Sequence, residues 1–102
     1  MARVIILMMD SFGIGGAPDA DRFGDAGADT FGHIADKFSG LHIPNLVRLG
    51  LVKAANAASG CHRELSDEGS AIDMPAKYGH CAEASIAKDT TSGHWELAGV
   101  TV

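Results

Sequence analysis

The chain has 102 residues, of which 46% are hydrophobic and 21% are charged, the balance of an ordinary globular protein. Its formal net charge is −5 and no basic run occurs, which excludes the charge pattern of nucleic-acid-binding proteins. The longest apolar run, residues 4–9, is too short to cross a membrane and lacks the features of a signal peptide. Two cysteines are too few for a disulfide scaffold, and the length allows at most one small domain. We expect a cytoplasmic protein with no nucleic-acid or membrane partner.

The amino-terminal segment predicts a buried β-strand. Residues 3–9 are apolar on both alternating faces and β-branched at their start, a pattern typical of a strand that a parallel sheet covers on both sides. Residues 11–29 are rich in glycine and aspartate and show no periodicity. They predict a long loop of the kind that is often functional.

A helix is predicted after this loop, with Thr30 as its N-cap and Gly40 just past its last turn. The apolar residues at positions i, i+3, i+4 and i+7 of its inner face are Phe31, Ile34, Ala35 and Phe38.

A second helix is predicted from Pro44 to the stop at Gly50, with Leu46 and Leu49 facing inward. Leu51 and Val52 fit the start of a short strand.

The second half of the chain has weaker signals. Residues 54–75 show no clear element, residues 77–86 fit a strand with small side chains, and residues 94–98 predict a short helix closed by Gly99. The alternation of strands and helices along the chain favours an α/β layered sheet.

Asp10 is a candidate metal ligand. It comes directly after the apolar strand, at the carboxyl edge where open α/β sheets bind their ligands. A hard divalent cation prefers such a carboxylate oxygen. A carboxylate in this position is also typical of a turn cap, and position alone does not decide between the two.

Two motif matches fail on single residues. Gly13 begins a glycine loop, but Pro18 stands where a dinucleotide fingerprint needs its third glycine, and no P-loop lysine follows. Asp19 begins an acidic stretch, but Phe23 and Thr30 stand where a calcium loop needs ligands. We expect neither kind of site here.

Two Cys-His pairs raise the question of zinc. They are Cys61 with His62, and His80 with Cys81. Adjacent residues of an extended chain point in opposite directions, so both members of a pair rarely converge on one ion. We therefore interpret them as ordinary unpaired residues.

Three hydroxyl groups, on Thr90, Thr91 and Ser92, precede the predicted helix at residues 94–98. The free N–H groups and the dipole at a helix start attract phosphate, and a hydroxyl there can act as a nucleophile if a metal or a base lowers its pKa. Such residues are also common helix caps.

Several long motifs in one order resemble the amino-terminal part of the bacterial phosphopentomutase family, metalloenzymes of the alkaline phosphatase superfamily. They are Val-Ile-Ile-Leu-Met-Met-Asp-Ser-Phe-Gly-Ile-Gly at 4–15, Ala-Pro-Asp-Ala-Asp-Arg-Phe-Gly-Asp at 17–25, Gly-Ala-Asp-Thr-Phe-Gly-His-Ile-Ala at 27–35, Ile-Pro-Asn-Leu-Val-Arg-Leu-Gly-Leu at 43–51 and Lys-Asp-Thr-Thr-Ser-Gly-His-Trp-Glu-Leu-Ala-Gly at 88–99. Residues 54–87 match no motif of the family.

The resemblance implies an α/β core sheet with helices on both faces and a cap domain inserted after the nucleophile region. It implies two Mn²⁺ ions at the carboxyl edge of the sheet, with Asp10 as a shared ligand. It makes Thr90 the carrier of the phosphoryl group and a metal contact. The implied reaction interconverts ribose 1-phosphate and ribose 5-phosphate, or their deoxyribose equivalents, with a sugar bisphosphate such as glucose 1,6-bisphosphate as activator.

By the same resemblance, residues 1–102 correspond to the amino-terminal segment of the core domain, without the cap and the downstream metal ligands. We expect these residues to be inactive alone, to need the downstream part of the same enzyme, and to leave residues 4–9 exposed to association. The alternatives are another mutase or phosphatase of the superfamily, and a non-catalytic metal- or phosphate-binding module. Thr91 and Ser92 are rival nucleophiles.

Overall fold

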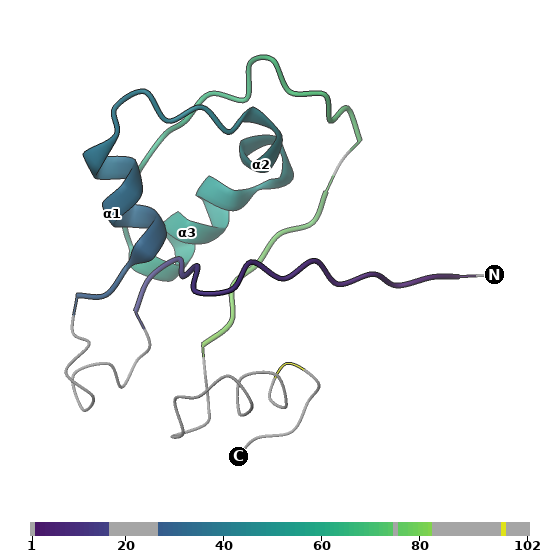
Figure 1. Ribbon diagram of the computed structural model, residues 1–102, viewed down its shortest axis with the longest axis horizontal. Coiled ribbons are helices and arrows are strands. Elements are labelled where there is room, and N and C mark those ends of the chain that lie inside the picture. Colours follow the sequence, from purple (N-terminus) through teal and green to yellow (C-terminus); the bar gives the residue numbers. More distant parts are fainter. Residues whose placement is uncertain (1, 17–26, 75, 83–96, 98–102) are drawn as a thin grey trace.

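The computed structural model describes residues 2–16, 27–74, 76–82 and 97. Within this part of the chain the elements are α1 (Thr30–Lys37), α2 (Pro44–Leu49) and α3 (Leu51–Ser59). Figure 1 shows the helices gathered on one side, with the amino-terminal segment running away from them as an extended chain. Among the described residues no helix is long and apolar enough to cross a membrane.

The N-cap of helix α1 lies one residue earlier than the sequence predicts. Asp29 is the N-cap, because its carboxylate accepts a 3.0 Å hydrogen bond from the Gly32 N–H, and Thr30 is the first helical residue. The carboxylate satisfies an amide that has no partner inside the helix. At the other end, Phe38 is the C-cap and is 60% exposed, so the predicted inner face stops short of it. Gly40 belongs to the turn that follows.

Helix α2 has the predicted bounds. Pro44 lies in its first turn, and Gly50 ends it in the left-handed conformation with φ 105°. Leu49, predicted to face inward, is 40% exposed, and Val47 packs against the core in its place. The inner face is thus rotated from the one that the leucine spacing indicates.

Helix α3 replaces the short strand predicted at Leu51. Gly50 turns the chain, and its carbonyl then accepts a 2.9 Å hydrogen bond from the Ala54 N–H, which starts a new helix at once. Residues 54–58 contain four alanines, the residue with the highest helix propensity. The prediction that residues 54–75 contain no helix or strand is therefore wrong for 54–59, whereas residues 60–74 contain neither.

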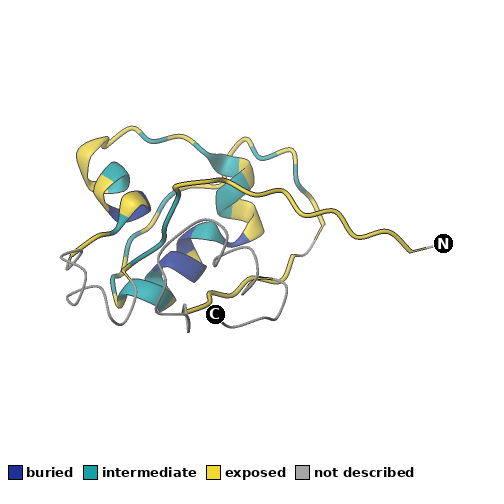
Figure 2. Ribbon diagram, turned by 60° about the horizontal axis from the view of Figure 1, so that its bottom comes forward, coloured by how far each residue is buried: buried dark blue, intermediate teal, exposed yellow. Residues whose placement is uncertain are grey.

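A small core joins the helices. It consists of Phe31, Val52 and Ala55, which are 1%, 6% and 2% exposed. Half-buried apolar side chains surround it: Phe12, Ile14, Ala35, Leu41, Ile43, Val47, Leu51 and Leu65. Figure 2 shows the buried positions on α1 and α3, with exposed chain around them.

The strand predicted at residues 3–9 has no pairing partner in the described part of the chain. Val4 and Leu7 are 90% and 91% exposed, so the predicted burial of this segment is not seen among the described residues. A helix closes its hydrogen bonds within its own segment, but a strand takes them from its neighbours. The described residues therefore contain no sheet, and the predicted α/β layering is not seen in them.

The structure describes only part of the strand and the helix predicted for the carboxyl-terminal part of the chain. Residues 76–82 contain no strand, and the rest of the predicted strand at 77–86 lies outside the described residues. Of the predicted helix at 94–98 only Leu97 is described; it is helical and 56% exposed.

Candidate functional site

Asp10 lies at the turn where the extended amino-terminal segment meets the helices. Its side chain is exposed, and Ser11 after it has a positive φ of 59°. Two residues further, the Gly13 carbonyl accepts a 2.9 Å hydrogen bond from the Phe31 N–H. The rings of Phe12 and Phe31 also meet, with centroids 5.9 Å apart. The turn is thus attached to the first turn of α1 just after Asp10.

An exposed carboxylate is a suitable oxygen donor for a hard cation. Within the described ranges, however, no group of three or more His, Cys, Asp or Glu side chains could hold a metal ion. Asp10 can therefore supply one ligand of a metal site, and the described residues do not bring a full set of ligands around it.

The second predicted site residue, Thr90, lies outside the described residues, as do its rivals Thr91 and Ser92. The acidic stretch at 19–24 lies outside them as well.

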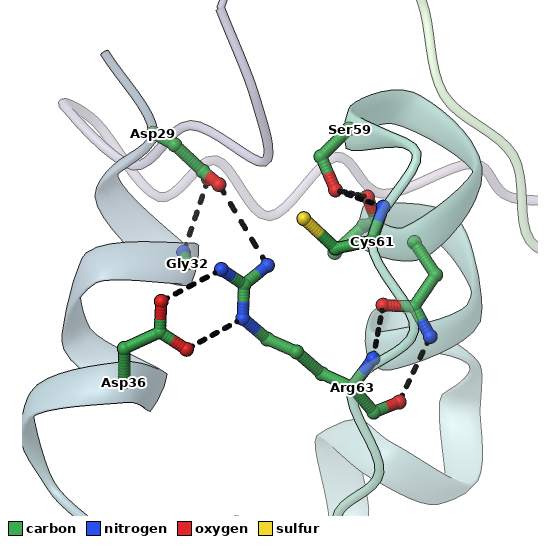
Figure 3. Close-up of polar contacts among 8 residues, drawn as sticks. Asp29, Gly32, Asp36, Ser59, Cys61 and Arg63 are labelled. Atoms are coloured by element: carbon green, nitrogen blue, oxygen red, sulfur yellow. Dashed lines mark hydrogen bonds and ion pairs between the residues drawn. The ribbon is translucent and has the colours of Figure 1, made fainter. Parts of the chain in front are cut away.

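The most extensive polar cluster in the described part of the chain centres on Arg63 (Figure 3). Its guanidinium donates to both oxygens of Asp36, from Nε and from one terminal nitrogen, at 2.9 Å each. Its other terminal nitrogen lies 3.8 Å from the carboxylate of Asp29. Arg63 and Asp29 are only 18% and 15% exposed in their side chains, whereas Asp36 is 63% exposed.

The backbone of Arg63 is held as firmly as its side chain. The amide of Asn56 in α3 donates to the Arg63 carbonyl at 2.9 Å and accepts from the Arg63 N–H at 3.0 Å. This residue pair joins the end of α3 to the segment that follows it.

The contact between Arg63 and Asp36 shifts the pKa values of both side chains. The hydrogen bond from Arg63 holds the pKa of the Asp36 carboxyl below its usual value, although desolvation acts in the opposite direction. The same bond raises the pKa of the Arg63 guanidinium, so that Arg63 stays charged at any pH at which the protein is folded.

Sequence reasoning missed this cluster. Arg63 belongs to a polar stretch without a motif, and its partner Asp36 lies 27 residues away in the chain. No helical or strand spacing connects residues so far apart, so charge pairing of this kind leaves no local signal.

The two Cys-His pairs do not form a metal site among the described residues. Cys61 is half-buried near Arg63 (Figure 3), while His62, His80 and Cys81 are exposed. Their local contacts are ordinary: the Cys61 N–H donates to the Ser59 hydroxyl at 3.3 Å.

Most of the chain matches a model of a known protein family. Residues 2–82 match the model of the metalloenzyme superfamily. The chain belongs to the metalloenzyme superfamily. The matched region contains Asp10 and Arg63 and ends before Thr90.

Individual relatives are also similar over the whole chain. A phosphopentomutase of Elusimicrobium minutum is 58% identical over 103 aligned residues, covering 100% of this chain and 26% of the relative. Phosphopentomutases of Idiomarina loihiensis and Pectobacterium atrosepticum are 52% and 50% identical, again over 100% of this chain and 26% and 27% of the relatives. The resemblance drawn from the motifs is confirmed, and it includes residues 54–87. The chain spans about a quarter of the length of these curated relatives.

Proposed function

We propose that this chain is the amino-terminal part of a phosphopentomutase. The complete enzyme interconverts ribose 1-phosphate and ribose 5-phosphate, or the deoxyribose forms. The observation that carries the proposal is the 58% identity to a phosphopentomutase over the entire chain. The match to the metalloenzyme superfamily supports a metal-dependent reaction.

Asp10 is proposed as a ligand shared by two Mn²⁺ ions. Its exposed carboxylate, at a turn attached to α1, suits that role chemically. Once bound, the ions would neutralise charge on the phosphoryl oxygens and lower the pKa of the Thr90 hydroxyl.

Thr90 is proposed to carry the phosphoryl group and to contact a metal ion. The phosphothreonine transfers its phosphoryl group to the free hydroxyl of a pentose monophosphate: the bond from phosphorus to Thr90 breaks, and a bond to the sugar oxygen forms. The resulting bisphosphate then returns its other phosphoryl group to Thr90, which leaves the isomeric monophosphate. Glucose 1,6-bisphosphate, or a similar sugar bisphosphate, supplies the first phosphoryl group.

The rest of the site is proposed to come from downstream residues of the same enzyme, together with the cap domain. In that enzyme residues 3–9 form a strand of a layered α/β core sheet with helices on both faces. Residues 1–102 alone would lack most of the metal ligands and would be inactive. We place the enzyme in the cytoplasm.

A chimera tests the proposal. This chain replaces the matching amino-terminal quarter of the Elusimicrobium minutum relative, and the purified protein is incubated with Mn²⁺ and glucose 1,6-bisphosphate. We expect conversion of ribose 1-phosphate, no conversion of a phosphoglycerate, and one added phosphoryl group at Thr90 by mass spectrometry with fragmentation.

Two variants of the chimera identify the nucleophile. Thr90→Val should abolish both phosphorylation and turnover, whereas Thr91→Val, one residue away, should keep the modification at Thr90. A fully active Thr90→Val variant would contradict the assignment, and turnover of phosphoglycerate instead of ribose 1-phosphate would favour another mutase of the superfamily.

A further inference from the structure

The cluster of Arg63, Asp29 and Asp36 differs from an ordinary surface ion pair in the burial and the backbone attachment of Arg63. Ion pairs on the surface contribute little and are usually mobile. Arg63 instead is mostly buried, and Asn56 holds its backbone through two hydrogen bonds. Arg63, in the segment after α3, is therefore fixed against α3 through Asn56, and its guanidinium reaches across to α1.

The guanidinium holds α1 at two places. It binds Asp36 in the last turns of the helix through two parallel hydrogen bonds, a geometry that restricts both position and angle. It also faces Asp29 at the start of the helix, where one carboxylate oxygen caps Gly32 and the other lies 3.8 Å from Arg63. One oxygen of Asp29 thus accepts a hydrogen bond, and the other makes a longer ion-pair contact without a hydrogen bond.

Gly32 shows how closely these groups approach. A Cβ at this position would collide with the Asp29 carboxylate and would lie 3.0 Å from a terminal nitrogen of Arg63. The helix can bring Asp29 and Arg63 together here only because residue 32 has no side chain.

The start of α1 in turn holds the turn that carries Asp10. The Phe31 N–H binds the Gly13 carbonyl at 2.9 Å, and Phe31 packs against Phe12. Between these anchors and Asp10 lies Ser11, whose positive φ of 59° is unfavourable for a residue with a side chain. A strained turn of this kind keeps its shape only while its flanks are held.

We infer that Arg63 is a positioning residue for Asp10. Through Asp29 and the first turn of α1 it holds the turn of residues 10–13 in one conformation, and so sets the direction in which the Asp10 carboxylate meets a metal ion. The inference rests on the proposed function for the metal role of Asp10. Residues that orient a metal ligand commonly change metal affinity about tenfold or more when they are removed.

The test uses the chimera as the complete enzyme and compares three variants. Arg63→Met removes the guanidinium, whereas Asp29→Asn keeps an N-cap of similar strength and removes only the charge that faces Arg63. Arg48→Met is the matched control, because Arg48 makes a single exposed contact of 3.7 Å with Asp67 and has no connection to the turn in the described part of the chain.

Four quantities are measured: the Mn²⁺ dissociation constant from the electron paramagnetic resonance of free Mn²⁺, hydrogen exchange of the peptide over residues 10–16, the unfolding temperature, and turnover at saturating Mn²⁺. We expect Arg63→Met and Asp29→Asn to raise the dissociation constant about tenfold and to speed the exchange. Turnover should recover at saturating Mn²⁺, and Arg48→Met should match the unchanged chimera.

A lower unfolding temperature with unchanged Mn²⁺ affinity and unchanged exchange at residues 10–16 would overturn the inference, since the cluster would then only stabilise the fold. Asp10→Asn separates this failure from that of the proposed function. If Asp10→Asn itself leaves Mn²⁺ affinity unchanged, both the metal role of Asp10 and the inference are wrong. If Asp10→Asn weakens binding and the other two variants do not, the inference alone is wrong.

Discussion

The apolar segment at residues 3–9 and the helical unit at residues 30–59 differ in how they bury their side chains. Phe31 in the helical unit is 1% exposed, while Leu7 in the apolar segment is 91% exposed. Helices α1 to α3 close their backbone hydrogen bonds locally and then pack against each other. The apolar segment needs neighbouring strands, and the described residues contain none. Asp10 lies at the junction, and Phe31 of the helical unit contacts the turn that follows it.

Removing the centre of the helical unit should give the largest effect. Phe31→Ala deletes the most buried side chain and its contact with Phe12, and should destabilise the unit by about 3–5 kcal/mol. Because so small a core has little stability in reserve, we expect loss of the helical circular dichroism signal.

Leu7→Ala is the control, since that side chain touches little in the described structure. It should leave the helical signal unchanged. Equal losses for the two variants would show that the apolar segment supports the helices, and would contradict the contrast drawn here.

The same contrast explains what could be predicted from the sequence. The ends of α2 follow from Pro44 and Gly50, whose backbone preferences act locally. The start of α3 was missed because Leu51 and Val52 suit a strand as well as a helix, and only the turn at Gly50 decides between them.

The candidate site shows more clearly which residues cannot be predicted from the sequence. Asp10 could be singled out because it directly follows an apolar run, a pattern within a few residues. The Arg63 cluster could not, because it joins segments 27 residues apart. Motifs single out residues that are close together in the sequence, whereas a cluster such as that of Arg63 depends on tertiary contacts.

Gly50 gives the second prediction, of intermediate size. Gly50→Ala introduces a side chain at φ 105° and places its Cβ 2.8 Å from three atoms of Tyr78. We expect a loss of about 2 kcal/mol in the free energy of unfolding, from the backbone strain and from displacement of Tyr78.

Gly60→Ala separates the two causes. Gly60 also has a positive φ, 76°, but a Cβ there would meet nothing within 4 Å among the described residues. It should cost only the strain, about 1 kcal/mol. Equal losses in chemical denaturation would show that segment 76–82 is not packed on the helical unit.

The third prediction concerns the apolar segment itself. Leu7→Lys should change the free energy of unfolding of the helices by less than about 0.5 kcal/mol, because Leu7 is exposed. It should reduce self-association of the 102-residue chain, since a charge on an unpaired strand opposes pairing between copies. Sedimentation velocity over a range of concentrations measures this; association that Leu7→Lys leaves unchanged would place the contact elsewhere.

The smallest expected effect is a pH dependence confined to the helical unit. Arg63 lowers the pKa of Asp36 in the folded chain, below the value of about 3.9 for an unfolded aspartate. The contact therefore stabilises fully above that unfolded value, and its contribution is lost as the pH falls through the lower, folded pKa. Asp36→Asn should remove this part of the acid sensitivity, whereas Asp73→Asn, at an exposed position, should retain it. Thermal unfolding measured from about pH 6 to about pH 2 tests this: where the Asp36 carboxyl titrates, the unfolding temperature of Asp73→Asn should fall more steeply with pH than that of Asp36→Asn. Parallel curves for both variants would show that the pairing of Asp36 with Arg63 does not hold α1 in place.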